Sequence, residues 1–456
     1  MQIGNWAIKR SPGQAAVLVV IVCAAAALAA FTWWAWGRST SRTYVEVRSF
    51  AGADGSKPLS GLILDSGGAI YGVTQFGGVA GQGTVFLLKP PVKAGEAWNE
   101  VVLHHFGSEN DGKYPVGELV FDKAGSLYGA TTYGGAGHGS VFKLTPPATG
   151  GDVWTESVLY RFRGADDGAN PWSGLVFDDS GALYGTTLWG GTHSRGAVFR
   201  LTPPRTAGGE WRESILYSFR GGDDGVGPKA RLVLDAGGAL YGTTESGGAS
   251  DRGTVFKLTP PAKAGGAWIK STLYSFLGGA DGAEPFSAVV SGPDGSLYGA
   301  TYYGGGARNC SGGCGIVFQL KPPAENAGKW TESVLYKFQG GANDGGNPSG
   351  VIMAADGSLF GAANSRGANL CGVVFQLSPP AKGSAAWKET ILYNFPTPAA
   401  PDPGGRTQGS DVAEKGARDI SYGGLALGRD GALFGVSPKG GVHQMGVVYE
   451  LQAAPK

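Results

Sequence analysis

The chain has 456 residues, of which 82 are glycine, and its formal net charge is +1 with only 16% charged residues. Nucleic-acid binding needs a clustered basic face, so this balance excludes nucleic acid as an expected partner. The glycines fall at fixed offsets between runs rich in Val, Leu, Tyr, Phe and Thr, which predicts a folded all-β protein and not a low-complexity tract.

The first forty residues predict a membrane segment. Residues 15–36 are 22 uncharged residues, "AAVLVVIVCAAAALAAFTWWAW", about 33 Å long as a helix and enough to span a bilayer. We expect a cytoplasmic N-terminus at 1–14, a transmembrane signal-anchor at 15–36 and a stalk at 37–42. The remainder would then be extracytoplasmic, in the periplasm or on the cell surface. A cleaved signal peptide is the alternative, and the protein would then be secreted.

A repeating unit occupies the rest of the chain. An aromatic-Gly pair marks seven copies, with its aromatic at Tyr71, Tyr128, Tyr184, Tyr241, Tyr298, Phe360 and Phe434. The copy that starts near Gly174 contains four strand-like runs, "GLVFD", "ALYGTT", "GAVFRLTP" and "RESILYSF", joined by turn residues. Four antiparallel strands at this period favour a seven-bladed β-propeller over 43–456.

The two ends of the repeat region predict how the ring closes. Thr43–Phe50, "TYVEVRSF", is similar to the fourth strand of a unit, whereas Gly446–Leu451, "GVVYEL", is a third strand with no fourth after it. We therefore expect Thr43–Phe50 to complete the last blade, so that no sheet edge is left open.

The pattern "LYGTT..GG....GTVF.LTP", followed by "W.E..LY.F", resembles the choice-of-anchor GloVer tandem repeat family over about Thr43–Leu451. The resemblance implies an exported, propeller-like repeat protein without an established activity. The seventh unit departs from the pattern: a long segment, Pro396–Tyr422, precedes it, and "FGVSPKGG" replaces the usual threonine pair.

Residues shared by most copies are expected to build the blades. We assign packing to six tryptophans, turn formation to one aspartate per crossover loop, and a solvated outer face to the repeated glutamates. The sets are Trp98, Trp154, Trp211, Trp268, Trp330 and Trp387; Asp54, Asp111, Asp167, Asp224, Asp281 and Asp344; and Glu100, Glu156, Glu213, Glu332 and Glu389.

Residues that differ between copies gather on one rim of the predicted ring, here called the top rim, which carries the crossover loops and the loops between second and third strands. Aromatic residues stand there before a Gly-Gly pair or after the crossover proline. These candidate ligand-binding residues are Phe76, Tyr133, Trp172, Trp189, Phe286 and Tyr303. Ring faces on a weakly charged funnel suit sugars or apolar peptides. The alternative is that they fill wedges between blades.

Cysteine usage predicts one disulfide. Cys310 and Cys314 share a loop of the fifth unit as "CSGGC", which outside the cytoplasm favours a disulfide between them. The role of Cys371 stays open. The sequence carries no motif that predicts a metal or a cofactor.

These features favour a non-catalytic, membrane-tethered propeller that binds carbohydrate or a protein partner at the cell envelope. Two alternatives stay open. One is an extracytoplasmic glycan-active lyase or hydrolase that uses acids of the long seventh-unit loop: Asp402, Asp411, Glu414 and Asp419. The other is a purely structural scaffold. Ligand identity, cleavage of 15–36 and oligomeric state are not determined by the sequence.

Overall fold

The structure is a computed structural model. It describes residues 42–93, 95–107, 111–135, 137–148, 153–206, 208–263, 265–324, 328–381, 384, 386–396 and 424–453. The predicted anchor at 15–36 and the four acids of the long seventh-unit loop lie outside these residues. Within the described part of the chain, no helix is both long and apolar enough to cross a membrane.

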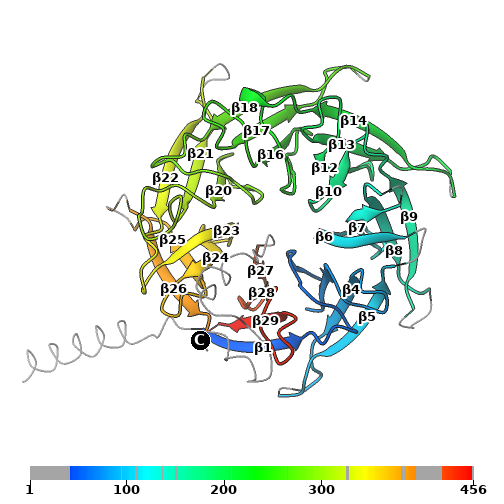
Figure 1. Cartoon of the computed structure of the whole chain (residues 1–456), viewed down its shortest axis with the longest axis horizontal. Coiled ribbons are helices and arrows are strands. Elements are labelled where there is room, and N and C mark those ends of the chain that lie inside the picture. Colours follow the sequence, from blue (N-terminus) through cyan, green and yellow to red (C-terminus); the bar gives the residue numbers. More distant parts are fainter. Residues whose placement is uncertain are drawn as a thin grey trace, which may run out of the picture. The chain divides into compact units, whose positions relative to one another are not determined.

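Seven sheets stand around a ring, each built from four antiparallel strand positions, which confirms the predicted all-β seven-bladed propeller (Figure 1). In blade 3 the innermost position is split between β10 and β11, which both pair with β12. One short 3-10 helix, η1 (Gly222–Asp224), lies in the crossover to blade 4.

The strands follow the chain blade by blade. Blade 1 has β2 (Ile63–Leu64), β3 (Ile70–Thr74), β4 (Thr84–Lys89) and β5 (Asn99–His105); blade 2 has β6 (Gly112–Phe121), β7 (Leu127–Gly134), β8 (Ser140–Thr145) and β9 (Thr155–Arg161); blade 3 has β10 (Ala169–Pro171), β11 (Val176–Phe177), β12 (Leu183–Trp189), β13 (Ala197–Thr202) and β14 (Arg212–Ser218). Blade 4 has β15 (Val233–Leu234), β16 (Leu240–Thr244), β17 (Thr254–Thr259) and β18 (Ile269–Ser275); blade 5 has β19 (Val290–Ser291), β20 (Leu297–Thr301), β21 (Ile316–Lys321) and β22 (Thr331–Lys337). Blade 6 has β23 (Gly345–Met353), β24 (Leu359–Arg366), β25 (Val373–Ser378) and β26 (Lys388–Asn394); blade 7 has β27 (Ala426–Leu427), β28 (Leu433–Ser437), β29 (Val447–Gln452) and the N-terminal β1 (Thr43–Ser49).

The ring closes as the chain ends predict. Strand β1 pairs antiparallel with β29, from Thr43 opposite Gln452 to Ser49 opposite Val447, and so supplies the outermost strand of blade 7. Tyr44 from β1 stacks on Tyr393 of blade 6, with ring centroids 4.8 Å apart. Backbone pairing therefore joins the two ends of the repeat region, and the aromatic contact attaches β1 to blade 6.

The recurring "YG" and "VF" pairs form the core of each blade. In blade 3, Gly185 of β12 lies opposite Phe199 of β13. A Cβ on Gly185 would lie 2.6 Å from the ring of Phe199, which is fully buried. The glycine is needed for space, because it leaves the pleated surface open for the neighbouring ring.

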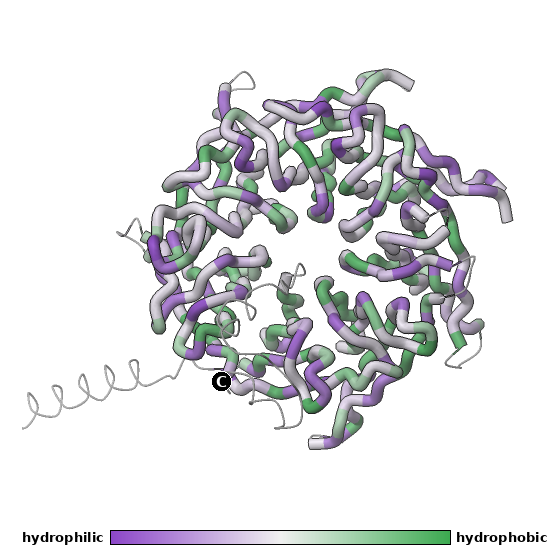
Figure 2. Tube along the Cα trace, viewed as in Figure 1, coloured by the Kyte–Doolittle hydropathy of each residue, from purple (hydrophilic) through white to green (hydrophobic). Residues whose placement is uncertain are grey.

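Aromatic rings also join neighbouring blades. The phenylalanine after each outermost strand packs on the central-strand ring of the next blade, with centroids 5.0–5.3 Å apart. We call these seven contacts the aromatic belt: Phe50–Phe86, Phe106–Phe142, Phe162–Phe199, Phe219–Phe256, Phe276–Phe318, Phe338–Phe375 and Phe395–Tyr449. Hydrophobic segments accordingly occur in every blade around the ring (Figure 2).

The repeated tryptophans pack between blades, as predicted. Each lies edge-on to the "YG" or "FG" aromatic of the preceding blade, in the pairs Trp98–Phe434, Trp154–Tyr71, Trp211–Tyr128, Trp268–Tyr184, Trp330–Tyr241 and Trp387–Tyr298.

The crossover aspartates form turns, as predicted. Asp224, for example, accepts the backbone N–H of Arg220 at 2.8 Å and the hydroxyl of Tyr217 at 2.7 Å. Asp167 takes the same place in the preceding junction, where Tyr160 donates to it at 2.8 Å.

The prediction of a solvated face for the repeated glutamates is wrong. All five are half-buried, and the Oε1 atom of each is buried without a hydrogen-bond partner among the described residues. Each lies near the crossover aspartate that precedes its own blade. Burial first, and then the aspartate's negative charge, raises the pKa of Glu156, Glu213 and Glu332 to about 7 and that of Glu389 to about 8. The pKa of Glu100 also rises to about 7, against the opposing charge of Arg48.

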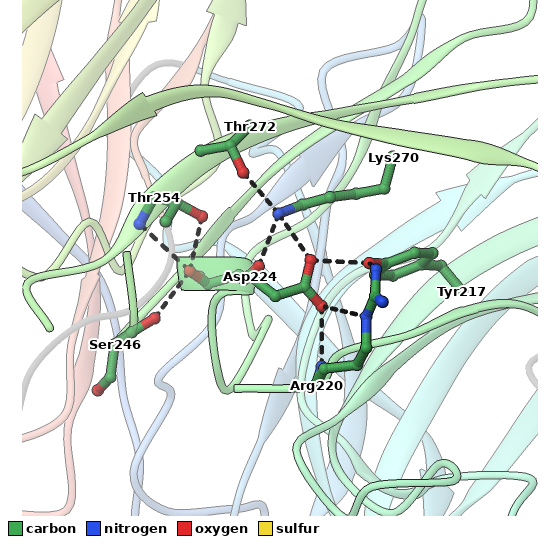
Figure 3. A network of polar contacts seen from close by, with 8 residues as sticks. Tyr217, Arg220, Asp224, Ser246, Thr254, Lys270 and Thr272 are labelled. Carbon is green, nitrogen blue, oxygen red and sulfur yellow. Dashed lines mark hydrogen bonds and ion pairs between the residues drawn. The ribbon is translucent and has the colours of Figure 1, made fainter. Parts of the chain in front are cut away.

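The junction between blades 3 and 4 carries a lysine in place of the glutamate (Figure 3). Lys270 Nζ lies 3.1 Å from Asp224 Oδ1 and donates to the Asp224 carbonyl and to Thr272 Oγ1. Its side chain is only 4% exposed, and burial lowers its pKa. The same location therefore holds an ion pair here and two carboxyl groups in five other junctions.

Candidate functional site

The crossover loops fix the residues that face the centre of the ring. At blade 3, Asn170 has φ 54° and donates its N–H to the carbonyl of His138 in blade 2, at 2.8 Å. The next residue, Pro171, lies so close to Gly139 of blade 2 that a Cβ there would be 2.7 Å from the proline Cδ. This contact fixes the backbone immediately before Trp172, which faces the centre of the ring.

The same backbone conformation before the crossover proline recurs around the ring. The residue before the crossover proline has a positive φ in six crossovers, at Lys57, Tyr114, Asn170, Gly227, Glu284 and Asn347. Five of these residues are not glycine, and the left-handed region is unfavourable before proline. The backbone is thus held in an uncommon conformation by the preceding blade at each of these positions.

A central pocket lies where the innermost strands meet, and residues from all seven blades line it. It contains about 700 Å³ of open space, including its solvent-filled mouth. The residue after each crossover proline lines it, and we call this set the first ring: Leu59, Val116, Trp172, Lys229, Phe286 and Ser349. Every member differs from the others.

A second ring of lining residues follows a short distance along the innermost strands. In each blade, one residue of the innermost strand pairs with the "YG" or "FG" aromatic, and the member of the second ring stands two residues before it in the sequence. The members are Gly61, Glu118, Gly174, Arg231, Ala288, Gly350 and Gly424. Five members are Gly or Ala, and the other two carry opposite charges. Glu118 Oε2 and Arg231 Nε lie 2.8 Å apart, although blade 3 separates their blades.

The small members of the second ring make room for this ion pair. A Cβ on Gly61 would lie 2.3 Å from Glu118 Oε1, and a Cβ on Gly174 would lie 3.1 Å from Arg231 Cδ. Glu118 therefore leans against blade 1, and Arg231 passes over blade 3. The side chains of Glu118 and Arg231 are 28% and 38% exposed, so the pair faces the open pocket.

The remaining charge of the first ring is also paired. Lys229 Nζ lies 2.9 Å from Glu245 Oε2 and 4.0 Å from the centroid of the Phe286 ring. Glu284 lies nearby, and burial together with the charge of Glu245 raises its pKa. The cations that line the pocket, Lys229 and Arg231, thus each have a carboxylate partner.

The predicted aromatic residues divide into two groups. Trp172 and Phe286 line the central pocket, whereas Phe76, Tyr133, Trp189 and Tyr303 do not. Tyr114 packs between Phe76 and Tyr133, at centroid distances of 5.1 and 5.9 Å, and Tyr302 links Phe286 to Tyr303 in the same way. Tyr133 and Trp189 are nearly half exposed on the rim, at 49% and 47%.

In the fifth blade's loop, Cys310 and Cys314 form a disulfide with their Cα atoms 5.0 Å apart. Cys371, in the matching loop of blade 6, is a free, half-buried thiol, and burial raises its pKa. Within the described ranges, no group of three or more His, Cys, Asp or Glu side chains is arranged to hold a metal ion.

The sequence reasoning missed Glu118 and Arg231. It compared the copies only at the residue after the crossover proline and before the Gly-Gly pair. Two positions further on, the copies read Gly61, Glu118, Gly174, Arg231 and Ala288. Two opposite charges at a position otherwise held by small residues are the signal that could have found them.

Fold and site together define a seven-bladed repeat propeller with a lined central pocket. The sequence model of the Gloeobacter/Verrucomicrobia repeat matches residues 34–156, 136–328 and 271–456. Since these matches span nearly the whole propeller, the chain belongs to this repeat family, and the family resemblance seen in the sequence is confirmed.

Two solved structures are distantly similar to the chain. No curated protein matches the chain. Among solved structures, a candidate 6-phosphogluconolactonase from Bacteroides uniformis is 17% identical, with a TM-score of 0.46 over 73% of this chain and 84% of its own. PorZ, a surface component of the type-IX secretion system of Porphyromonas gingivalis, is 14% identical, with a TM-score of 0.48 over 89% of this chain and 48% of its own. No activity is transferred from either.

Proposed function

We propose that this protein is an exported propeller, tethered by residues 15–36, that binds a carbohydrate or a protein partner of the cell envelope at its central pocket. One observation carries the proposal: the residues that build the blades repeat, while the first ring, which lines the pocket, differs at every position. A binding surface on a repeat scaffold is expected to have this pattern, because ligand contact places different demands on each blade.

The chemistry of the pocket supports binding. Trp172 and Phe286 offer aromatic faces, and the charged side chains of the lining are paired. Aromatic faces combined with a few fixed polar groups are typical of small-molecule and glycan pockets. The half-buried glutamates with raised pKa lie on the outermost strands and do not line the pocket, so they give no support to a catalytic function there.

Two tryptophans of blade 3 provide a matched test. Trp172 lines the pocket, and Trp189 is exposed on the rim outside it. The full chain, purified in detergent, would be screened against a glycan array and an envelope extract beside the Trp172→Ala and Trp189→Ala variants. We expect binding to be lost in Trp172→Ala and kept in Trp189→Ala. Loss in Trp189→Ala alone would place binding on the outer rim, and absence of binding by the folded wild type would refute the proposal.

A further inference from the structure

We infer that the central pocket takes an uncharged sugar ring, stacked on Trp172, with two neighbouring hydroxyl groups bridging Glu118 and Arg231. This inference rests on the proposed function and narrows its ligand to one class, a neutral glycan. Neither Glu118 nor Arg231 belongs to the repeated motif of the sequence.

The charge of the pocket selects against an ionic ligand. Its cations are Lys229 and Arg231, and each already has a carboxylate within 2.9 Å, Glu245 and Glu118 respectively. An acidic sugar would have to displace one of these carboxylates, and a cationic ligand would have to displace Lys229 or Arg231. Either exchange leaves a partly desolvated charge unpaired, which is unfavourable. A neutral polyol requires no such exchange.

The geometry of the ion pair suits hydroxyl groups. The 2.8 Å contact joins one carboxylate oxygen of Glu118 to the Nε of Arg231. A carboxylate has a second acceptor oxygen, and a guanidinium has four further N–H groups. Adjacent sugar hydroxyls can donate to the first and accept from the second, and hydrogen bonds to charged groups are roughly twice as strong as neutral ones.

Trp172 lines the same pocket as this polar pair. It precedes Gly174 by two residues in the segment that joins β10 and β11, and the Arg231 side chain passes over Gly174. The pocket therefore combines an aromatic face with a donor–acceptor pair. A sugar ring presents the matching surfaces, since its C–H face is apolar and its edge carries hydroxyls.

The test uses tetrasaccharides of equal length and different charge. Isothermal titration of the full chain with cellotetraose, mannotetraose, xylotetraose and tetragalacturonate is expected to show binding of at least one neutral probe and weaker binding of the acidic one. Affinity for the neutral probe should fall about tenfold or more in the double variant Glu118→Ala, Arg231→Ala. This variant removes both charges together, so neither is left unpaired. In Glu118→Gln, which keeps a hydrogen-bonding side chain, the loss should be smaller.

The outcomes separate the two proposals. Tighter binding of tetragalacturonate, or unchanged affinity in the double variant, would overturn the neutral-glycan inference. Trp172-dependent capture of an envelope protein without any tetrasaccharide binding would also overturn it, while the proposed function would stand. If the folded protein binds neither glycan nor envelope protein, both fail.

Discussion

The aromatic belt uses two positions in every blade and the first ring uses one position in six blades, and the two sets differ in composition and in burial. The belt uses phenylalanine at every position except Tyr449, and all of its members except the half-buried Phe395 are buried. The first ring holds Leu, Val, Trp, Lys, Phe and Ser, and several of these side chains reach open space. Uniformity therefore marks the positions on which ring assembly depends, and variety marks positions that are free to meet a ligand.

The largest expected effect is on the belt. Phe256 is fully buried and packs on Phe219 of the preceding blade at 5.1 Å. Truncating a buried phenylalanine typically costs about 3–5 kcal/mol. We therefore expect Phe256→Ala to lower the free energy of unfolding by this amount in urea titrations. A loss below about 1 kcal/mol would mean that the belt does not hold the blades together.

The next effect is a dependence of stability on pH. The repeated glutamates, with pKa raised to about 7 or 8, keep protons in the folded state that the unfolded chain loses near pH 4.5. Their contribution to stability is fully present below about pH 4.5 and is lost as the pH rises to about 8. The lowered pKa of Asp122 and Asp178 acts in the opposite direction, below pH 4.

Stability is therefore lost below about pH 4 through the aspartates and toward pH 8 through the glutamates. We expect the melting temperature to be highest near about pH 5 and to fall toward pH 8. Glu389→Gln, which cannot ionise, should flatten the decline when melting is followed by circular dichroism. A melting temperature that rises from pH 5 to pH 8 would contradict the assignment of these carboxyl pairs.

A smaller change should follow at the one junction that carries a lysine. Lys270→Glu replaces the ion pair with Asp224 by a sixth carboxyl pair. We expect this variant to melt lower than wild type, and the difference to be greater at pH 8 than at pH 5, where a buried glutamate can hold a proton. Lys270→Met is the control, since it removes the charge and should show a difference that varies less with pH.

The repeat made most of the fold predictable from sequence. Seven copies of an aromatic-Gly pair, six of them followed by "VF", predict the blades, and the unpaired runs at the two chain ends predict the β1–β29 closure. The burial of Glu156 was not predictable from its position on an outer strand. The carboxyl group that approaches it belongs to Asp111, which lies in a crossover loop 45 residues earlier in the chain.

The candidate site was predictable only in part. Trp172 and Phe286 stand out as aromatic residues after a crossover proline, and both line the pocket. Trp189 stands out equally in the sequence, yet it lies on the rim, because it ends β12, which is separated from the axis by the innermost strands of blade 3. Glu118 and Arg231 are distant in sequence, and they meet because blades 2 and 4 approach each other across the small residue Gly174 of blade 3.

The most direct measurement is the unfolding free energy and ligand binding of one variant, Trp172→Ser with Phe286→Ser, which gives both blades the residue type that blade 6 has at Ser349. Because these side chains are only partly buried, we expect one cooperative transition and a stability loss smaller than that of Phe256→Ala, together with loss of binding. A loss of unfolding free energy equal to or larger than that of Phe256→Ala would contradict the account. Trp172 and Phe286 would then hold neighbouring blades together and would not form a surface that is available to a ligand.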